Sequence, residues 1–124
     1  MDATAEEWAR LAHDRAEIAD TLHRFAFGLD HGDADSMASA LTEDCVFDFS
    51  PAAKKLGIDF GAVTGRETVV SAVIVLIGPL DTSHTASNLQ IEVSGDTATL
   101  HCYVMAQHFM PGQGPRQGSE NALL

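Results

Sequence analysis

Basic residues are scarce in this chain of 124 residues. Seven lysines and arginines stand against 18 aspartates and glutamates, so the formal net charge at pH 7 is −11. A nucleic-acid partner needs a basic face that replaces the counterions of its phosphates, and an anionic membrane surface also attracts positive charge. The shortage of positive charge therefore predicts that the chain binds neither nucleic acid nor membrane.

Cysteine and long apolar runs are also rare. Cys45 and Cys102 lie far apart in the sequence, and we expect two buried thiols in a reducing cytoplasm. Residues 1–8 lack the basic and apolar stretches of a signal peptide, and the longest apolar run, 69–77, is too short to span a bilayer. These features predict a cytoplasmic protein whose residues 1–124 form a single domain.

Several common catalytic motifs are missing. No histidine or cysteine pair has the spacing of a metal site, and no glycine-rich phosphate loop is present. Neither a serine elbow nor the sequence context of a lysine nucleophile occurs. We therefore expect chemistry that requires no metal ion and no organic cofactor.

A long amphipathic helix is predicted near the start of the chain. Thr4 and Glu7 form a capping box at its beginning, and Gly32 is typical of a helix end. Apolar residues recur on one helix face at Ile18, Leu22, Phe25 and Leu29. Asp30 lies about 100° around the helix from Leu29, at the border of this face. A side chain at that border can line a cavity beside the core.

A β-hairpin of two strands is predicted in the second half of the chain. Polar and apolar residues alternate over 88–93 and again over 97–109, and Ser94-Gly95-Asp96 forms a tight turn between them. Residues 119–124 could begin another strand. Before the hairpin we expect a short helix after Asp33, a strand over 45–49, a loop or lid over 50–64, and a helix over 69–77.

Two histidines of the hairpin region are candidates for acid–base chemistry. His108 has the parity of the apolar residues in its strand, so it faces inward, where it is either an acid or a satisfied core histidine. His84 shares the register of the polar residues Asn88 and Gln90. A bulge or irregular strand entry near Thr85 is needed to turn it inward. The alternative for His84 is a strand-entry histidine bonded to backbone.

Asp30 and His84 are candidates for a catalytic pair inside one pocket. A carboxylate that holds an imidazole turns the ring into an oriented general base near neutral pH. The alternative for Asp30 is a carboxylate that ends the helix or caps the following loop.

Short segments spread over residues 8–110 carry a resemblance to a known family. These segments are residues 25–30, 34–44, 65–67, 84–88 and 103–108. In content and order they resemble the SnoaL-like branch of the nuclear-transport-factor-2-like superfamily. The resemblance implies a cone-shaped α+β barrel, in which a bent, mainly antiparallel sheet wraps around N-terminal helices and encloses an apolar pocket. Its members usually continue with two more strands, so we expect that the sequence is truncated after Leu124, or that a neighbouring chain completes the sheet.

The resemblance also implies roles for individual residues. Scytalone dehydratase, bile-acid 7α-dehydratase and hexachlorocyclohexane dehydrochlorinase are similar in placing an Asp and a His where Asp30 and His84 stand. In that group the pair abstracts a proton from carbon while a leaving group departs. A second pocket histidine of scytalone dehydratase resembles His108. The implied activity is that of a cofactor-independent lyase or isomerase acting on a hydrophobic steroid-, terpenoid- or polyketide-like ring compound.

Four apolar side chains are expected to bind this substrate: Phe25, Phe27, Phe47 and Val104. Because Phe25 can neither donate nor accept a proton, the acid for the leaving group would be His108, a water molecule or the substrate itself. The outer face of the hairpin carries a mixed surface of His101, Tyr103 and Met105, which predicts a homodimer or homotrimer.

Two other functions stay open. A non-catalytic module for small-ligand binding or assembly can use the same fold. A water-activating arrangement of two aspartates and an arginine, as in the related epoxide hydrolases, would need Arg66 or Arg116 beside Asp44, Asp48 or Asp59.

Overall fold

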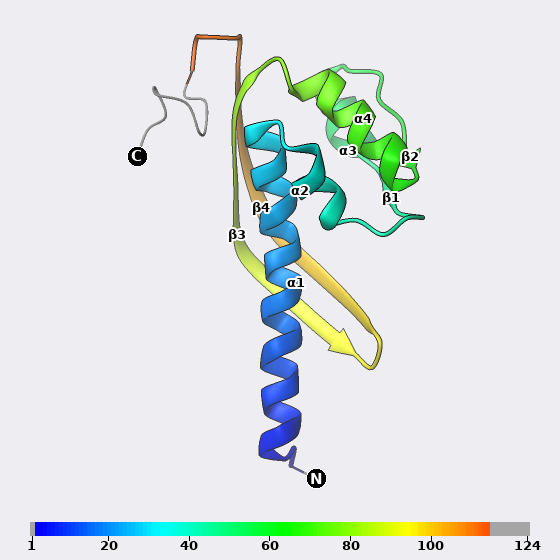
Figure 1. Ribbon diagram of the computed structural model, residues 1–124, viewed down its shortest axis with the longest axis vertical. Helices are drawn as coiled ribbons and strands as arrows, with labels where there is room; N and C mark the ends of the chain where they lie inside the picture. The colour runs from blue at the N-terminus through cyan, green and yellow to red at the C-terminus, as the bar shows by residue number, and fades with distance from the viewer. Residues whose placement is uncertain (1, 115–124) are drawn as a thin grey trace.

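The computed structural model describes residues 2–114, in which helices precede a long antiparallel hairpin (Figure 1). In chain order the elements are α1 (Ala5–His31), α2 (Ala34–Ser39), β1 (Val46–Phe47), α3 (Ser50–Leu56), β2 (Val63–Thr64), α4 (Arg66–Ile77), β3 (Asp81–Ser94) and β4 (Thr97–Phe109). This order confirms the α+β class. The strand expected within 119–124 lies outside the described residues.

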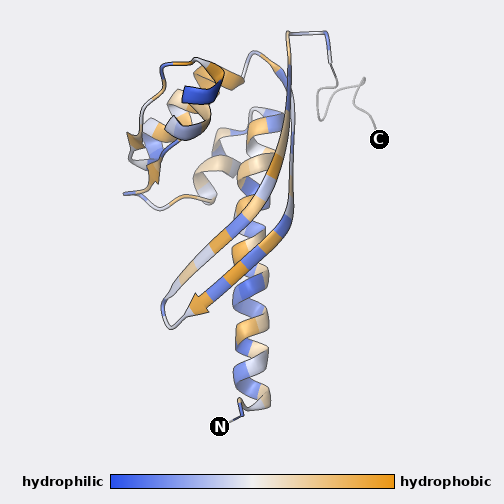
Figure 2. Ribbon diagram, turned by 180° about the vertical axis from the view of Figure 1, so that it is seen from behind, coloured by the Kyte–Doolittle hydropathy of each residue, from blue (hydrophilic) through white to orange (hydrophobic). Residues whose placement is uncertain are grey.

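Helix α1 begins and ends where its capping residues predict. The Thr4 hydroxyl accepts from the Glu7 amide at 3.2 Å, and the Thr4 amide donates to the Glu7 carboxylate at 2.6 Å. Gly32 ends the helix in the left-handed conformation with φ of 64°. The upper half of α1 lies between the hairpin and the group formed by α2, α3 and α4, while its N-terminal part extends beyond the hairpin tip (Figures 1 and 2).

The prediction of a loop or lid over residues 50–64 is wrong for its first half, which folds as helix α3. Pro51 stands in the first turn of α3, where the missing amide proton costs nothing, and Gly57 ends the helix with φ of 70°. The helix expected over 69–77 is confirmed as α4, which begins at Arg66. The strand expected over 45–49 is shorter than expected, since only Val46 and Phe47 pair with β2.

The buried core joins α2 and α4. It consists of Met37, Val69, Val70 and Val73, with partly buried apolar residues of α1 packed against it. Arg15 ties the hairpin to α1 by donating from Nη1 to the backbone oxygen of Ile91 at 2.9 Å. The core therefore fixes the C-terminal half of α1, which carries Asp30.

The hairpin pairs β3 with β4 over nearly their full lengths. Strand β4 is confirmed at residues 97–109, but β3 begins at Asp81, seven residues before the expected start at Asn88. Apolar and polar residues alternate along both strands (Figure 2). Within residues 2–114 the two sheets, β1–β2 and β3–β4, do not close into a barrel. No helix in this part of the chain combines the length and the apolar character needed to cross a membrane.

Candidate functional site

A bulge in β3 determines which way His84 faces. Ser87 pairs with Tyr103 and Gln90 with His101, so two residues of β3 lie opposite one residue of β4. Asn88, the first of these two residues of β3, has a positive φ of 54°. The predicted irregularity therefore exists, but it lies at Asn88 and not near Thr85.

The bulge reverses the parity of the strand residues that precede it. His84 pairs with Ala106, and Ile91 pairs with Leu100 on the same face of β4. His84 consequently shares a face with the buried Ile91, although the sequence separation of the two residues is odd. His108 belongs to this same face of β4.

Asp30 meets His84 across the gap between α1 and β3. Oδ1 of Asp30 lies 2.7 Å from Nδ1 of His84, and Oδ2 accepts the backbone amide of His84 at 3.0 Å. The side chains are shielded, with 9% of Asp30 and 14% of His84 exposed. Hydrogen bonds to a charged partner are strong where water is largely excluded. The carboxylate thus fixes both the ring and the backbone of His84.

The second ring nitrogen of His84 is open. Within residues 2–114 no hydrogen bond involves its Nε2, and the one buried side-chain nitrogen or oxygen without a hydrogen bond is Nε of Arg24, which is paired with Asp20. Nε2 of His84 is therefore not fully buried. A small molecule or a water molecule can reach it.

His108 lies against His84 from the β4 side. Their ring centroids are 5.2 Å apart, and the rings are nearly perpendicular. Partial burial lowers the pKa of His108 below its ordinary value of 6.5, and the neighbouring His84 lowers it further, against a smaller opposite effect of Asp30. The lowered pKa therefore favours the neutral form of His108 at pH 7.

Two cavities flank α1, and the pair Asp30–His84 lines the smaller one. This cavity of about 250 Å³ is also lined by His23, Ala26 and Phe27 of α1 and by residues 83, 85 and 86 of β3. The larger cavity, of about 530 Å³, is apolar and includes Phe25, Phe47 and Leu100 in its lining. The two cavities share no lining residue.

The four residues expected to bind substrate do not line one common cavity. Phe25 and Phe47 pack together, with ring centroids 6.1 Å apart, at the larger cavity. Phe27 lines the cavity of the pair, but it is 64% exposed and stacks on His31. Val104 lies on the His84 face of β4 and is 57% exposed.

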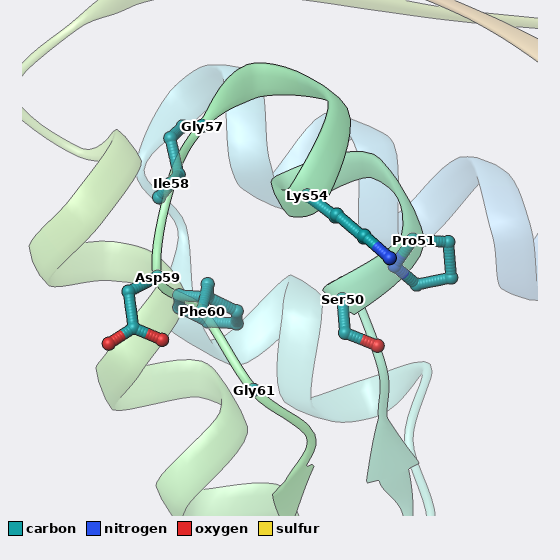
Figure 3. A pocket seen from close by; sticks show the side chains of 8 residues that line it. All are labelled: Ser50, Pro51, Lys54, Gly57, Ile58, Asp59, Phe60 and Gly61. Carbon is teal, nitrogen blue, oxygen red and sulfur yellow. The ribbon is translucent and has the colours of Figure 1, made fainter.

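A third, more open hollow of about 600 Å³ lies apart from these residues (Figure 3). All of its lining comes from α3 and the loop that follows, from Ser50 to Gly61. It contains neither member of the pair. Lys54 and Asp59 are the charged residues in its lining.

Sequence reasoning missed Thr82. Its hydroxyl donates to Oδ1 of Asp30 at 3.1 Å, and only 1% of the residue is exposed. The period of two residues along a strand would have placed Thr82 beside His84 on one face. The signal was lost because the strand was expected to begin only at Asn88.

The described residues contain no cluster that could bind a metal ion. They also bring none of Asp44, Asp48 and Asp59 into an ion pair with Arg66. Residues 2–114 contain no group of three or more His, Cys, Asp or Glu side chains placed to hold a metal ion. Arg66 donates to the backbone oxygen of Leu41, and Asp48 accepts from Ser50. Arg116 lies outside the described residues.

Comparison with known proteins places this geometry in a family. The family model of the SnoaL-like domain matches residues 10–122. The chain belongs to the SnoaL-like family. A curated member, terrestric acid biosynthesis cluster protein E of Penicillium crustosum, is 31% identical over 111 residues, which is 89% of this chain. The chain spans 65% of the length of that relative.

Solved structures of similar proteins share the SnoaL-like fold. The Kfla4162 protein of Kribbella flavida is 25% identical, with a TM-score of 0.69 over 86% of this chain and 73% of its own. A protein of Novosphingobium aromaticivorans, provisionally assigned as a scytalone dehydratase, is 28% identical, with a TM-score of 0.65 over 86% of this chain and 66% of its own. The family and fold implied by the sequence segments are thereby confirmed.

Proposed function

We propose that this SnoaL-like chain is a lyase or isomerase that removes a proton from a carbon atom of a hydrophobic, oxygenated ring compound. The observation that carries the proposal is the 2.7 Å contact between Nδ1 of His84 and Oδ1 of Asp30. An ionised carboxylate only accepts hydrogen bonds, so the proton of the neutral ring lies on Nδ1. The lone pair of Nε2 is then free to take a proton from carbon.

In the proposed reaction, His84 removes a proton from a carbon next to an electron-withdrawing group such as a carbonyl. The electron pair of the broken C–H bond forms an enolate, which either expels a neighbouring hydroxyl group or is protonated at another carbon. The imidazolium of His84 returns its proton to the departing oxygen or to that carbon. Asp30 stabilises the imidazolium between these two transfers.

We assign to His108 the role of a hydrogen-bond donor. Because its lowered pKa favours the neutral ring at pH 7, the prevailing form of His108 carries one N–H group and no positive charge. A neutral donor stabilises negative charge that develops on a carbonyl or leaving oxygen. The contact between the rings of His108 and His84 supports this role.

The lining of the site and the similar proteins both bear on the class of substrate. Ala26 and Phe27 contribute apolar side chains to the cavity of the pair, and the net charge of −11 disfavours anionic ligands. One relative belongs to the biosynthesis cluster of terrestric acid, and another is provisionally assigned as a scytalone dehydratase. These features support an uncharged, oxygenated ring compound.

Exchange of carbon-bound protons with deuterium tests the proposal. Cyclic ketones with and without a β-hydroxyl group are incubated with the protein in D2O and followed by proton NMR. We expect the wild type to accelerate deuterium uptake or loss of water, and His84→Ala to slow it about 100-fold or more. His101→Ala is the matched control, since His101 is exposed on the other face of β4. Equal rates for His84→Ala and the wild type would contradict the proposal.

A ligand-binding module without catalysis is the second candidate function. The observation in its favour is that the larger apolar cavity shares no residue with the cavity of Asp30 and His84. A module of this kind would bind an apolar ring compound equally well as wild type and as His84→Ala, and neither form would exchange its protons. Turnover that depends on His84 excludes this function.

A further inference from the structure

Thr82 is buried beside the Asp30–His84 pair without lining either cavity. It is 1% exposed, and it lies two residues before His84 in β3. Residues two apart in a strand point to the same face, so both side chains approach α1 together. Thr82 is not among the residues that line the cavity of the pair, and its side chain reaches the site through Asp30.

Three donors from this one short segment hold the carboxylate of Asp30. Oδ1 accepts the Thr82 hydroxyl at 3.1 Å and faces Nδ1 of His84 at 2.7 Å. Oδ2 accepts the backbone amide of His84 at 3.0 Å. The contact with Nδ1 orients the ring of His84, which is the proposed base. The contacts with the Thr82 hydroxyl and the His84 amide restrain the carboxylate itself.

We propose that Thr82 is a positioning residue, whose hydroxyl locks the carboxylate of Asp30 in the orientation that holds Nδ1 of His84. This inference rests on the proposed function, since it assigns a part in the same site. Without the hydroxyl, the amide of His84 is the one remaining fixed donor from β3. The carboxylate can then rotate about its last bond, and Oδ1 leaves the line of the Nδ1–H group.

A hydrogen bond that is not made costs most at a buried site. A hydrogen bond to a charged acceptor is stronger than one between neutral groups, and it is strongest where water is excluded. Thr82 and Asp30 are both shielded, so water replaces a lost hydroxyl poorly. Valine has nearly the shape of threonine without the hydroxyl, and serine keeps the hydroxyl without the methyl group.

Titratable groups near His84 could also change how its ring proton exchanges with water. Asp30 and His23 face it from α1, and His108 faces it from β4. Thr82→Val changes none of these titratable groups. Altered behaviour of the ring proton in that variant therefore reports on the orientation of Asp30.

The test is proton and nitrogen-15 NMR of the full chain without substrate. The Nδ1–H signal of His84 is assigned by its loss in His84→Ala, and its exchange rate with water is measured. We expect Thr82→Val to speed this exchange about tenfold or more, and Thr82→Ser to leave it within about twofold of the wild-type rate. If Thr82→Val does not fold, the pair Thr82→Ala and Thr82→Ser gives the same comparison, because both lack the methyl group.

Wild-type protection of the Nδ1–H proton in Thr82→Val would overturn the positioning role. So would equal exchange in Thr82→Val and Thr82→Ser, which indicates a packing role alone. On a ketone that the wild type turns over, we expect Thr82→Val to lower kcat about tenfold with little change in KM. Absence of any turnover in the wild type would reject the proposed function, whereas the exchange rates would still decide the role of Thr82.

Discussion

At the scale of single residues, the backbone of Asn88 has the widest effect. Its positive φ of 54° accompanies the extra residue in β3, and this bulge brings His84 to the face that α1 covers. Asparagine tolerates the left-handed region better than most residues, which suits it to this position. The 2.7 Å contact between His84 and Asp30 depends on this one irregularity.

A residue-scale prediction concerns the pH dependence of stability through His108. Its pKa is lowered in the folded chain, so between the ordinary value of 6.5 and the lowered value the unfolded chain binds more protons. Stability is therefore lost as the pH falls through this window and is fully present above it. We expect the wild type to lose more unfolding free energy than His108→Gln between about pH 8 and about pH 5.

Urea unfolding of both proteins at the two pH values measures this difference. The remaining five histidines are common to both chains, so their contributions cancel in the comparison. The effect is small because His108 is only partly buried. An equal or greater loss in His108→Gln would show that His108 is not destabilised when charged.

At the scale of elements, the close approach of α1 and α2 depends on Gly28. It is the buried residue of α1, and a Cβ atom there would lie 2.8 Å from the backbone nitrogen of Met37 and 2.9 Å from the backbone oxygen of Asp33. Met37 is fully buried in the core. This contact sets the position of the last turn of α1, from which Asp30 reaches His84.

We therefore expect Gly28→Ala to destabilise the fold by about 2 kcal/mol, as overpacking does. Alanine gains up to about 1 kcal/mol of helix propensity over glycine. The added Cβ would also meet Cγ of the buried Met37, and the other two clashing atoms belong to the backbone and cannot turn away. Gly61→Ala is the matched control, since no atom lies within 4 Å of its added Cβ. Unchanged stability of Gly28→Ala in urea unfolding would contradict the packing argument.

The sequence predicts those elements whose signals are local. Thr4 and Glu7 mark the start of α1 and Gly32 marks its end, because capping is decided within one turn. Strand β4 has an uninterrupted alternation and was predicted with its full length. The residue pair Asp30 and His84 was also predicted, from its motifs and the family resemblance, and the structure brings the two side chains into contact.

The remaining features depend on contacts between distant parts of the chain. Residues 81–87 lack strand alternation of their own and become extended because they pair with β4. Pro51 and Gly57 predict a loop where helix α3 forms, because these residues are typical of loops except at the two ends of a helix. The sequence does not reveal Thr82 because it lies in residues 81–87, which lack strand alternation of their own.

At the scale of the whole molecule, the SnoaL-like chain separates its polar pair from its apolar cavity. The C-terminal half of α1 stands between the hairpin and the α2–α4 group, with His84 on the hairpin side (Figure 1). Tyr103 and Met105 are more than 70% exposed on the outer face of β4. The homodimer or homotrimer expected from that face stays a prediction, as does the cytoplasmic location.

The protonation pattern of the His84 ring tests the central claim most directly. Nitrogen-15 NMR of the full chain at about pH 8.5, where an ordinary histidine is neutral, distinguishes a protonated ring nitrogen from a bare one. The account predicts a protonated Nδ1 and a bare Nε2 in the wild type, with this preference lost in Asp30→Asn. A ring protonated at Nε2 in the wild type would contradict the claim that Asp30 prepares His84 to take a proton from carbon.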